Sequence, residues 1–186
     1  MARTGRNRVS RKEAHALYHS TIHDLGERGD AVKKEILGSR ADYACFIIDR
    51  NINFTNICAA ECDFCAFYRE KDDPEAFTLT VDEILEKVRD LKKIGGTQVM
   101  IQGGIHERYD LTFYKEIFSA IKKSFPDIYI HSCSPAEIDS LAKREKKSVY
   151  DTIVELKEAG LQSLPGAAEI LVDEHRAKVS PRKLKS

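Results

Sequence analysis

Apolar residues recur at helical spacing over one central segment and then form a short continuous run. The segment 81–94 places apolar side chains three or four positions apart, at Val81, Ile84, Leu85, Val88, Leu91 and Ile94. Thr80 and Glu83 form a capping-box pattern at its start, and Gly95 and Gly96 follow its end. This pattern predicts an amphipathic helix. The apolar run from Gln98 to Gln102 that follows predicts a buried strand.

The same succession repeats towards the C-terminus. Apolar spacing predicts a helix over about 112–124, a strand over 128–131, a helix over about 148–159 that ends at Gly160, and a short fourth strand over 161–165. Ser134, Pro135 and Glu137 supply an N-cap, a proline at the first helical position and an acidic third residue, so another helix begins there. With a first strand within 43–55, this alternation predicts parallel βαβ units.

The first forty residues have a different pattern. Ser10 and Glu13 form a capping box that predicts a helix over about 11–25, and a second helix is expected over about 30–37, ended by Gly38. His15, His19 and His23 would then lie on one polar face. We expect a helical extension over 1–40 and an α/β core over 41–186.

The composition restricts the class of protein. The 186 residues include 30 Lys and Arg against 30 Asp and Glu, so no excess of charge favours nucleic acid or an anionic membrane as a partner. No apolar run approaches the roughly 20 residues that span a bilayer, and no apolar segment follows the basic start. The five cysteines suit a reducing compartment. We therefore expect a cytoplasmic protein.

Three of the cysteines are clustered, as Cys58, Cys62 and Cys65 in the pattern Cys-x₃-Cys-x₂-Cys. Thiolates this close together favour a soft-metal site. A closed structural zinc site takes four ligands, whereas an iron–sulfur cluster held by three cysteines keeps one iron free. The ferredoxin spacings bring four cysteines and do not match. A structural zinc loop or buried thiols are the alternatives, and Cys45 and Cys133 are interpreted as small buried hydrophobes.

With Phe64 as the aromatic residue of Cys-x₃-Cys-x-aromatic-Cys, the loop resembles that of the radical S-adenosylmethionine superfamily. The flanks 49–56 (Asp-Arg-Asn-Ile-Asn-Phe-Thr-Asn) and 65–69 (Cys-Ala-Phe-Tyr-Arg) resemble the members that act in menaquinone biosynthesis through futalosine. The resemblance implies an α/β partial TIM-like barrel, with about four βα units present after the N-terminal helices. Because the family core usually has six such units, we expect this chain to match the N-terminal half of the family. A longer protein or a second chain would then complete the barrel.

The resemblance also implies cofactors and partners. Cys58, Cys62 and Cys65 would bind three irons of a 4Fe–4S cluster, and the fourth iron would hold S-adenosylmethionine. A 5′-deoxyadenosyl radical would then abstract hydrogen from a small-molecule nucleoside substrate. An electron donor such as flavodoxin or ferredoxin would reduce the cluster.

Further site residues are implied by position in the family pattern. Phe64, Gly103 and Gly104 would contact the cofactor, since glycine lets the main chain approach closely. Glu169 would bind cofactor hydroxyls and act in catalysis, although the stretch 165–170 (Pro-Gly-Ala-Ala-Glu-Ile) has fewer glycines than the family's. His131, Ser134 and Glu137 resemble the family's His-x-Phe-Ser-Pro-x-Glu-Ile segment, and His131 would lie near the substrate.

The reaction implied is cyclisation of dehypoxanthine futalosine. An aminofutalosine synthase and a deazaflavin-forming relative are alternatives within the superfamily, because they share the surroundings of the cysteines. A non-catalytic iron–sulfur or zinc-binding module is the alternative of another class.

Overall fold

A computed structural model describes residues 8–166, 170 and 172–183 of the chain. The chain forms two compact units, Met1–Phe46 and Ile47–Ser186. Within the described residues, none of the helices combines the length and apolar character needed to cross a membrane.

The first unit contains α1 (Arg11–Leu17), α2 (Ile22–Leu37) and the 3₁₀ turn η2 (Gly38–Arg40). The expected boundaries, 11–25 and 30–37, are wrong because Thr21 and Asp24 form a second capping box that starts a new helix. This helix continues through Gly26 and Gly29, and it ends at Gly38, whose φ is 53°. The three histidines therefore do not share one helical face.

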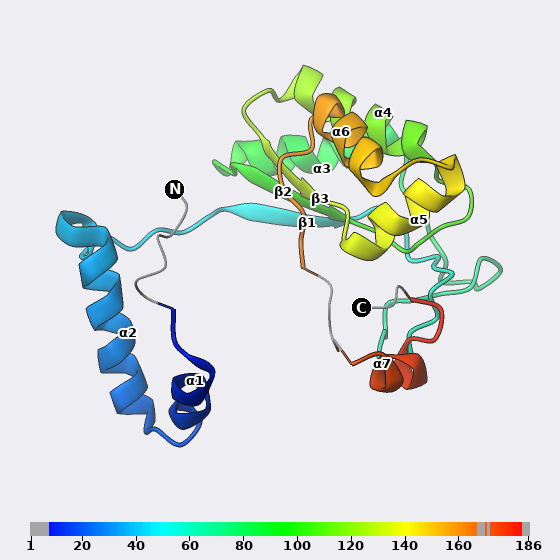
Figure 1. The fold of residues 1–186 in the computed structure, drawn as a ribbon. Helices are drawn as coiled ribbons and strands as arrows, with labels where there is room; N and C mark the ends of the chain where they lie inside the picture. The colour runs from blue at the N-terminus through cyan, green and yellow to red at the C-terminus, as the bar shows by residue number, and fades with distance from the viewer. Residues whose placement is uncertain (1–7, 167–169, 171, 184–186) are drawn as a thin grey trace. The chain divides into compact units, whose positions relative to one another are not determined.

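The second unit is built on a parallel three-stranded sheet in the order β1 (Asp49–Asn53), β2 (Gln98–Gln102) and β3 (Tyr129–Ser132). Helix α3 (Val81–Lys93) connects β1 to β2, and α4 (Leu111–Ser124) connects β2 to β3. The expected βαβ units and the α/β fold are thus confirmed, and β2 has the predicted bounds (Figure 1).

The chain beyond β3 partly differs from the expectation. Helices α5 (Pro135–Glu145) and α6 (Val149–Ala159) form as predicted. The predicted fourth strand lies beside β3 but pairs through one parallel bridge, His131 to Ser163, so the sheet has three strands among the described residues. The sequence pattern did not predict the short helix α7 (Asp173–Val179).

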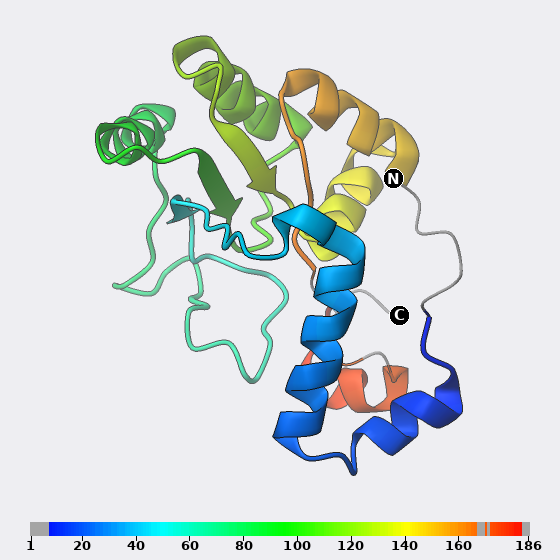
Figure 2. The ribbon, with the colours of Figure 1, turned by 90° about the vertical axis from the view of Figure 1, so that its left-hand side faces the viewer.

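Helices α3 to α6 cover one face of the sheet (Figures 1 and 2). Alternate strand residues, among them Ile52, Val99, Ile101 and Ile130, are buried on that face because successive side chains of a strand point to opposite faces. They pack against the apolar stripes of the helices, which supply Ile84, Val88, Leu91, Ile117, Phe118, Ile121, Ile138, Leu141 and Leu156. This core fixes the carboxyl ends of the strands, where the cysteine loop begins.

Phe54 anchors the chain directly after β1. Its ring is fully buried, and its centroid lies 5.5 to 6.0 Å from those of Tyr109, Phe113 and Tyr114. Its main-chain N–H donates to the Gln102 carbonyl at 3.0 Å. The residues leading to Cys58 therefore start from a fixed point in the core.

Replacing Phe54 with alanine should destabilise the second unit by about 3–5 kcal/mol, the cost of a large cavity in an aromatic core. Denaturant unfolding measures this change. Phe46→Ala is the matched control, because that ring is 83% exposed, and it should change stability by about 0.5 kcal/mol or less. Equal effects of the two substitutions would contradict a central role for Phe54.

Candidate functional site

The loop that carries the cysteines is fastened at its base by two buried polar residues. Thr55 Oγ1 donates to the Phe77 carbonyl at 2.8 Å. Asn56 Nδ2 donates to the Glu75 carbonyl at 2.9 Å, and Asn56 Oδ1 accepts from the Phe77 N–H at 2.8 Å. These bonds join the start of the loop to the segment that leads into α3.

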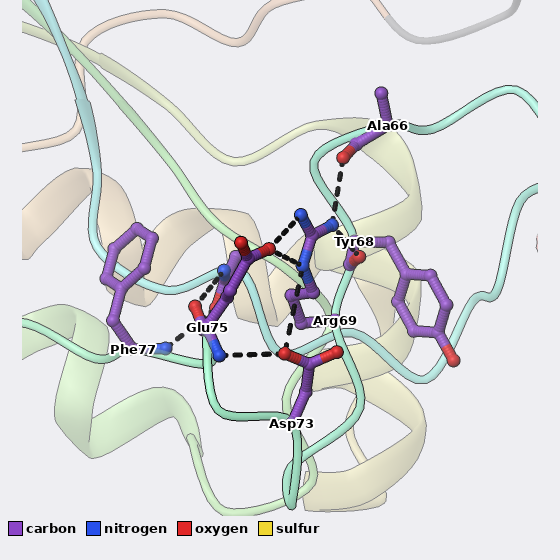
Figure 3. A network of polar contacts seen from close by, with 7 residues as sticks. Ala66, Tyr68, Arg69, Asp73, Glu75 and Phe77 are labelled. Carbon is purple, nitrogen blue, oxygen red and sulfur yellow. Dashed lines mark hydrogen bonds and ion pairs between the residues drawn. The ribbon is translucent and has the colours of Figure 1, made fainter.

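Arg69 fastens the far side of the same loop (Figure 3). Its Nη1 donates to the carbonyls of Ala66 and Tyr68 at 3.0 and 2.8 Å, and its Nε donates to Glu75 at 2.8 Å. Asp73 lies 3.9 Å from Nε. One guanidinium therefore links the residues after Cys65 to the turn at 73–75.

A third attachment comes from the C-terminal part of the chain. The Asp63 N–H donates to the Val179 carbonyl at 2.9 Å, and Arg182 pairs with the Glu61 carboxylate. Glu61 has a φ of 45°, in the left-handed region that non-glycine residues rarely adopt. The last residue of α7 and the segment after it therefore hold the strained turn between the first two cysteines.

Cys58, Cys62 and Cys65 border one pocket of about 290 Å³, together with Gly103 and Gly104. Each thiol is partly exposed. Among the described residues, no three His, Cys, Asp or Glu side chains converge on a point suited to a single metal ion. An iron–sulfur cluster does not require its ligands to converge on one point, because each thiolate binds a separate iron at the cluster surface.

Cys58 has the most defined surroundings of the three. Its Sγ accepts hydrogen bonds from the Ala60 N–H at 3.4 Å and from the Ile105 N–H at 3.3 Å. Burial raises the pKa of the Cys58 thiol, while these two N–H groups lower it. Since a metal ligand must be a thiolate, donors directed at the sulfur suit a ligand. Three soft donors around one pocket, with N–H groups on one sulfur, fit a cluster.

Gly103 and Gly104 allow β2 to meet the cysteine loop. A Cβ on Gly104 would lie 2.1 Å from the Ile57 carbonyl oxygen and 2.7 Å from Cys58 Cβ, and one on Gly103 would lie 2.4 Å from the Phe54 ring. The Gly104 N–H donates to the Thr55 carbonyl at 3.0 Å, and Ile105 accepts from the Ala59 N–H at 2.8 Å. The space around both residues therefore excludes any side chain.

The other predicted site residues lie in different places. Phe64 borders the cysteine pocket and is 52% exposed. His131 borders a separate cavity near Tyr129, and its Nδ1 lies 2.6 Å from Ser163 Oγ. Its role near a substrate stays a prediction. Glu169 lies outside the described residues.

Several residues around the pocket were not predicted. They are Asn53, Asn56, Gln102 and Lys183. Asn53 and Gln102 are the last residues of the paired strands β1 and β2. Because active sites of such barrels lie at the carboxyl ends of the strands, their positions in the sequence could have indicated them. Ser134 and Glu137 also border the pocket, and the resemblance of their segment to the family pattern had pointed to them.

Three cysteines at the carboxyl ends of parallel strands suit an iron–sulfur protein. The chain belongs to the radical SAM superfamily, whose family model matches residues 52–185. Members of this superfamily use a 4Fe–4S cluster and S-adenosylmethionine.

Two curated relatives are similar over nearly the whole chain. The 5-amino-6-(D-ribitylamino)uracil–L-tyrosine 4-hydroxyphenyl transferase of Methanococcus maripaludis is 41% identical over 184 residues, which are 96% of this chain and 50% of the relative. The cyclic dehypoxanthine futalosine synthase of Streptomyces coelicolor is 40% identical over 179 residues, which are 95% of this chain and 45% of that protein. The chain thus spans about half the length of these relatives.

Solved structures agree on the fold. Methylornithine synthase (PylB) matches with a TM-score of 0.68 and 19% identity, over 94% of this chain and 48% of that chain. The [FeFe]-hydrogenase maturase HydG matches with a TM-score of 0.68 and 17% identity, over 93% of this chain and 37% of its own. At these identities the likeness concerns the fold.

Gly104→Ala should destabilise the protein by about 1–3 kcal/mol, because the added Cβ meets main-chain atoms that cannot move aside. Gly29→Ala is the control, since no atom lies within 4 Å of its Cβ position in α2, and it should stabilise by about 0.5–1 kcal/mol. Denaturant unfolding of the metal-free protein distinguishes the two. A neutral Gly104→Ala would show that the two segments do not meet this closely.

Proposed function

We propose that this chain binds a 4Fe–4S cluster through Cys58, Cys62 and Cys65, and S-adenosylmethionine beside Gly103 and Gly104, in a radical-forming enzyme. The observation that carries the proposal is that all five residues border one pocket at the carboxyl ends of β1 and β2. When bound, the cluster would supply the electron that cleaves S-adenosylmethionine.

The chain's own groups have distinct tasks in this proposal. The N–H groups of Ala60 and Ile105 hold the Cys58 sulfur in place and favour its charged form. Gly103 and Gly104 expose main chain to the cofactor. Phe64 and Phe67 border the pocket and offer apolar surface that limits access of water. A small acidic electron carrier such as flavodoxin or ferredoxin would deliver the electron.

For the substrate we propose a small nucleoside, with cyclisation of dehypoxanthine futalosine as the reaction. The similarity to the Streptomyces coelicolor synthase supports this assignment. The uncharged amides of Asn53 and Gln102 at the pocket suit it, because an amide can both donate to and accept from a nucleoside. A 4-hydroxyphenyl transfer to 5-amino-6-(D-ribitylamino)uracil is the second candidate, supported by the equally similar Methanococcus relative.

Cys62→Ala should abolish cluster assembly, because the loop then offers two thiolates instead of three. After anaerobic reconstitution with iron and sulfide, the variant should lose absorbance at about 400 nm, where thiolate-bound clusters absorb. It should also release no 5′-deoxyadenosine on reduction with S-adenosylmethionine. Cys45, which was expected to be buried, is exposed and lies outside the loop, so Cys45→Ala should behave like the wild type. Retained cleavage in Cys62→Ala would refute the assignment.

The two substrates can be compared directly with the reconstituted chain. Incubation with dehypoxanthine futalosine and reductant should yield the cyclic product, detected by mass spectrometry. Incubation with 5-amino-6-(D-ribitylamino)uracil and L-tyrosine should yield none. The reverse result would favour the transferase, and no product from either would argue against both reactions for this chain.

A further inference from the structure

The face of the sheet opposite α3 to α6, the open face, carries mostly polar side chains. They alternate with the buried residues of each strand, and on β1 and β2 they include four carboxamides, at Asn51, Asn53, Gln98 and Gln102. Asparagine is depleted in strands, and the inner face of parallel barrels is usually filled by branched apolar residues. So many hydrogen-bonding groups on this face therefore point to a polar ligand.

The strand register arranges these side chains in rows. Asn53 and Gln102 form the row that borders the cysteine pocket. Asn51, Met100 and His131 form the next row, two residues earlier along β1 and β2. Since a strand rises about 3.3 Å per residue, the two rows lie about 7 Å apart. Apart from the imidazole of His131, both rows lack acidic and basic groups, so a ligand that extends from the pocket along this face meets a neutral surface.

The ring of His131 is fixed by the segment that follows α6. Its Nδ1 lies 2.6 Å from Ser163 Oγ. The main chain of Ser163 is held by β3, because its N–H donates to the Ile130 carbonyl at 3.3 Å and its carbonyl accepts from the Ser132 N–H at 3.0 Å. The side chains of His131 and Ser163 both border a cavity of about 600 Å³. The hydroxyl therefore meets the imidazole from a main chain that is bonded on both sides.

The length of this hydrogen bond indicates its direction. Hydrogen bonds from hydroxyl groups have a typical length of about 2.7–2.8 Å, whereas those from N–H groups are about 2.9–3.0 Å long. At 2.6 Å, the Ser163 hydroxyl is the donor and His131 Nδ1 is the acceptor. A neutral imidazole carries one proton, which is then on Nε2. No described residue is hydrogen bonded to this Nε2, so its N–H is available to a ligand.

We propose that Ser163 is a positioning residue that keeps the proton of His131 on Nε2, and that Nε2–H donates to an oxygen of an uncharged, hydroxyl-bearing substrate on the open face. The carboxamides of Asn51 and Asn53 would bind further hydroxyl or carbonyl groups, because an amide both donates and accepts. The identity of the ligand rests on the function proposed above. The contact between Ser163 and His131 concerns only this chain.

Four variants separate positioning from a general structural role. Ser163→Ala removes the hydroxyl, and Ser163→Thr retains it. His131→Gln identifies the resonances of His131 among those of the six histidines. Gln162→Ala is the matched control, because Gln162 Oε1 fastens the same segment by accepting from the Ile130 N–H at 3.1 Å and from Lys122 Nζ at 2.7 Å.

The first measurement uses the metal-free protein labelled with nitrogen-15 histidine. Two-dimensional NMR spectra in alkaline buffer, where imidazole is neutral, show which ring nitrogen carries the proton. In the wild type we expect His131 to be protonated on Nε2, with the Nδ1 resonance shifted upfield because Nδ1 accepts a hydrogen bond. Ser163→Ala should move this resonance downfield to the position of a free imidazole, and Ser163→Thr should not. Gln162→Ala should lower the thermal midpoint and leave both ring resonances unchanged.

A proton on Nδ1 in the wild type would overturn the inference. So would an Nδ1 resonance that is the same in the wild type and in Ser163→Ala. An equal displacement in Gln162→Ala would also overturn it, because the whole segment would then orient the ring and the hydroxyl would have no role of its own.

The second measurement follows binding of dehypoxanthine futalosine to the reconstituted protein by isothermal titration calorimetry. Ser163→Ala should weaken binding about fivefold, the scale of one hydrogen bond between neutral groups, and Ser163→Thr should stay within about twofold of the wild type. His131→Gln should weaken binding at least as much as Ser163→Ala.

The two measurements distinguish failure of the inference from failure of the proposed function. If the wild type binds neither dehypoxanthine futalosine nor 5-amino-6-(D-ribitylamino)uracil, the proposed function and the ligand assignment fail together, while the NMR result still decides whether Ser163 sets the proton of His131. If the wild type and Ser163→Ala bind equally well, only the inference fails.

Discussion

The close approach of two main-chain segments, 55–58 and 103–105, is the constraint on which the site depends. Their hydrogen bonds continue the β1–β2 pairing beyond the ends of both strands, through Thr55 and Ile105. A side chain at Gly104 would occupy the position of the Ile57 carbonyl. The first residues of the cysteine loop therefore extend the sheet, and the position of Cys58 follows from the β1–β2 pairing.

The aromatic core of the second unit packs against these two main-chain segments and keeps them close together. Phe54 fills the space under Gly103, and three aromatic rings from the chain leading into α4 and from α4 itself surround it. Because close-packed interiors transmit small displacements, a change in this aromatic group would move the glycine pair. The geometry of the site in this protein therefore depends directly on the packing of the core.

Much of this arrangement could be predicted from the sequence where the signals are local. The bounds of β2, the capping boxes at Ser10, Thr80 and Ser134, and the cysteine spacing all depend on neighbouring residues. Thr21 and Asp24 form a capping box like the others, but the apolar spacing over 11–25 predicted one continuous helix, so the start of α2 was not predicted. The fourth segment does not become a strand, because its ladder with β3 is limited to the one bridge between His131 and Ser163.

Contacts between distant segments could not be predicted in the same way. Glu137 has the sequence signature of a helix cap, and its contact with Tyr114 of α4 has no counterpart in the neighbouring residues. The attachment of Val179 to Asp63 likewise has no counterpart in the local pattern. Side chains whose function comes from long-range contacts look, in sequence, like ordinary structural residues.

The three cysteines differ in how firmly the protein holds them, and this difference bears on cluster assembly. Cys58 extends from the sheet and already has two N–H donors at its sulfur. Cys62 follows the left-handed Glu61, which is held by Arg182, and Cys65 lies in the turn closed by its own N–H to the Cys62 carbonyl. Since turns adjust at a lower free-energy cost than paired strands, Cys58 can serve as the fixed ligand to which the other two adapt. A cluster bound here would be held most firmly through Cys58, which lies against the main chain of Gly104 and Ile105.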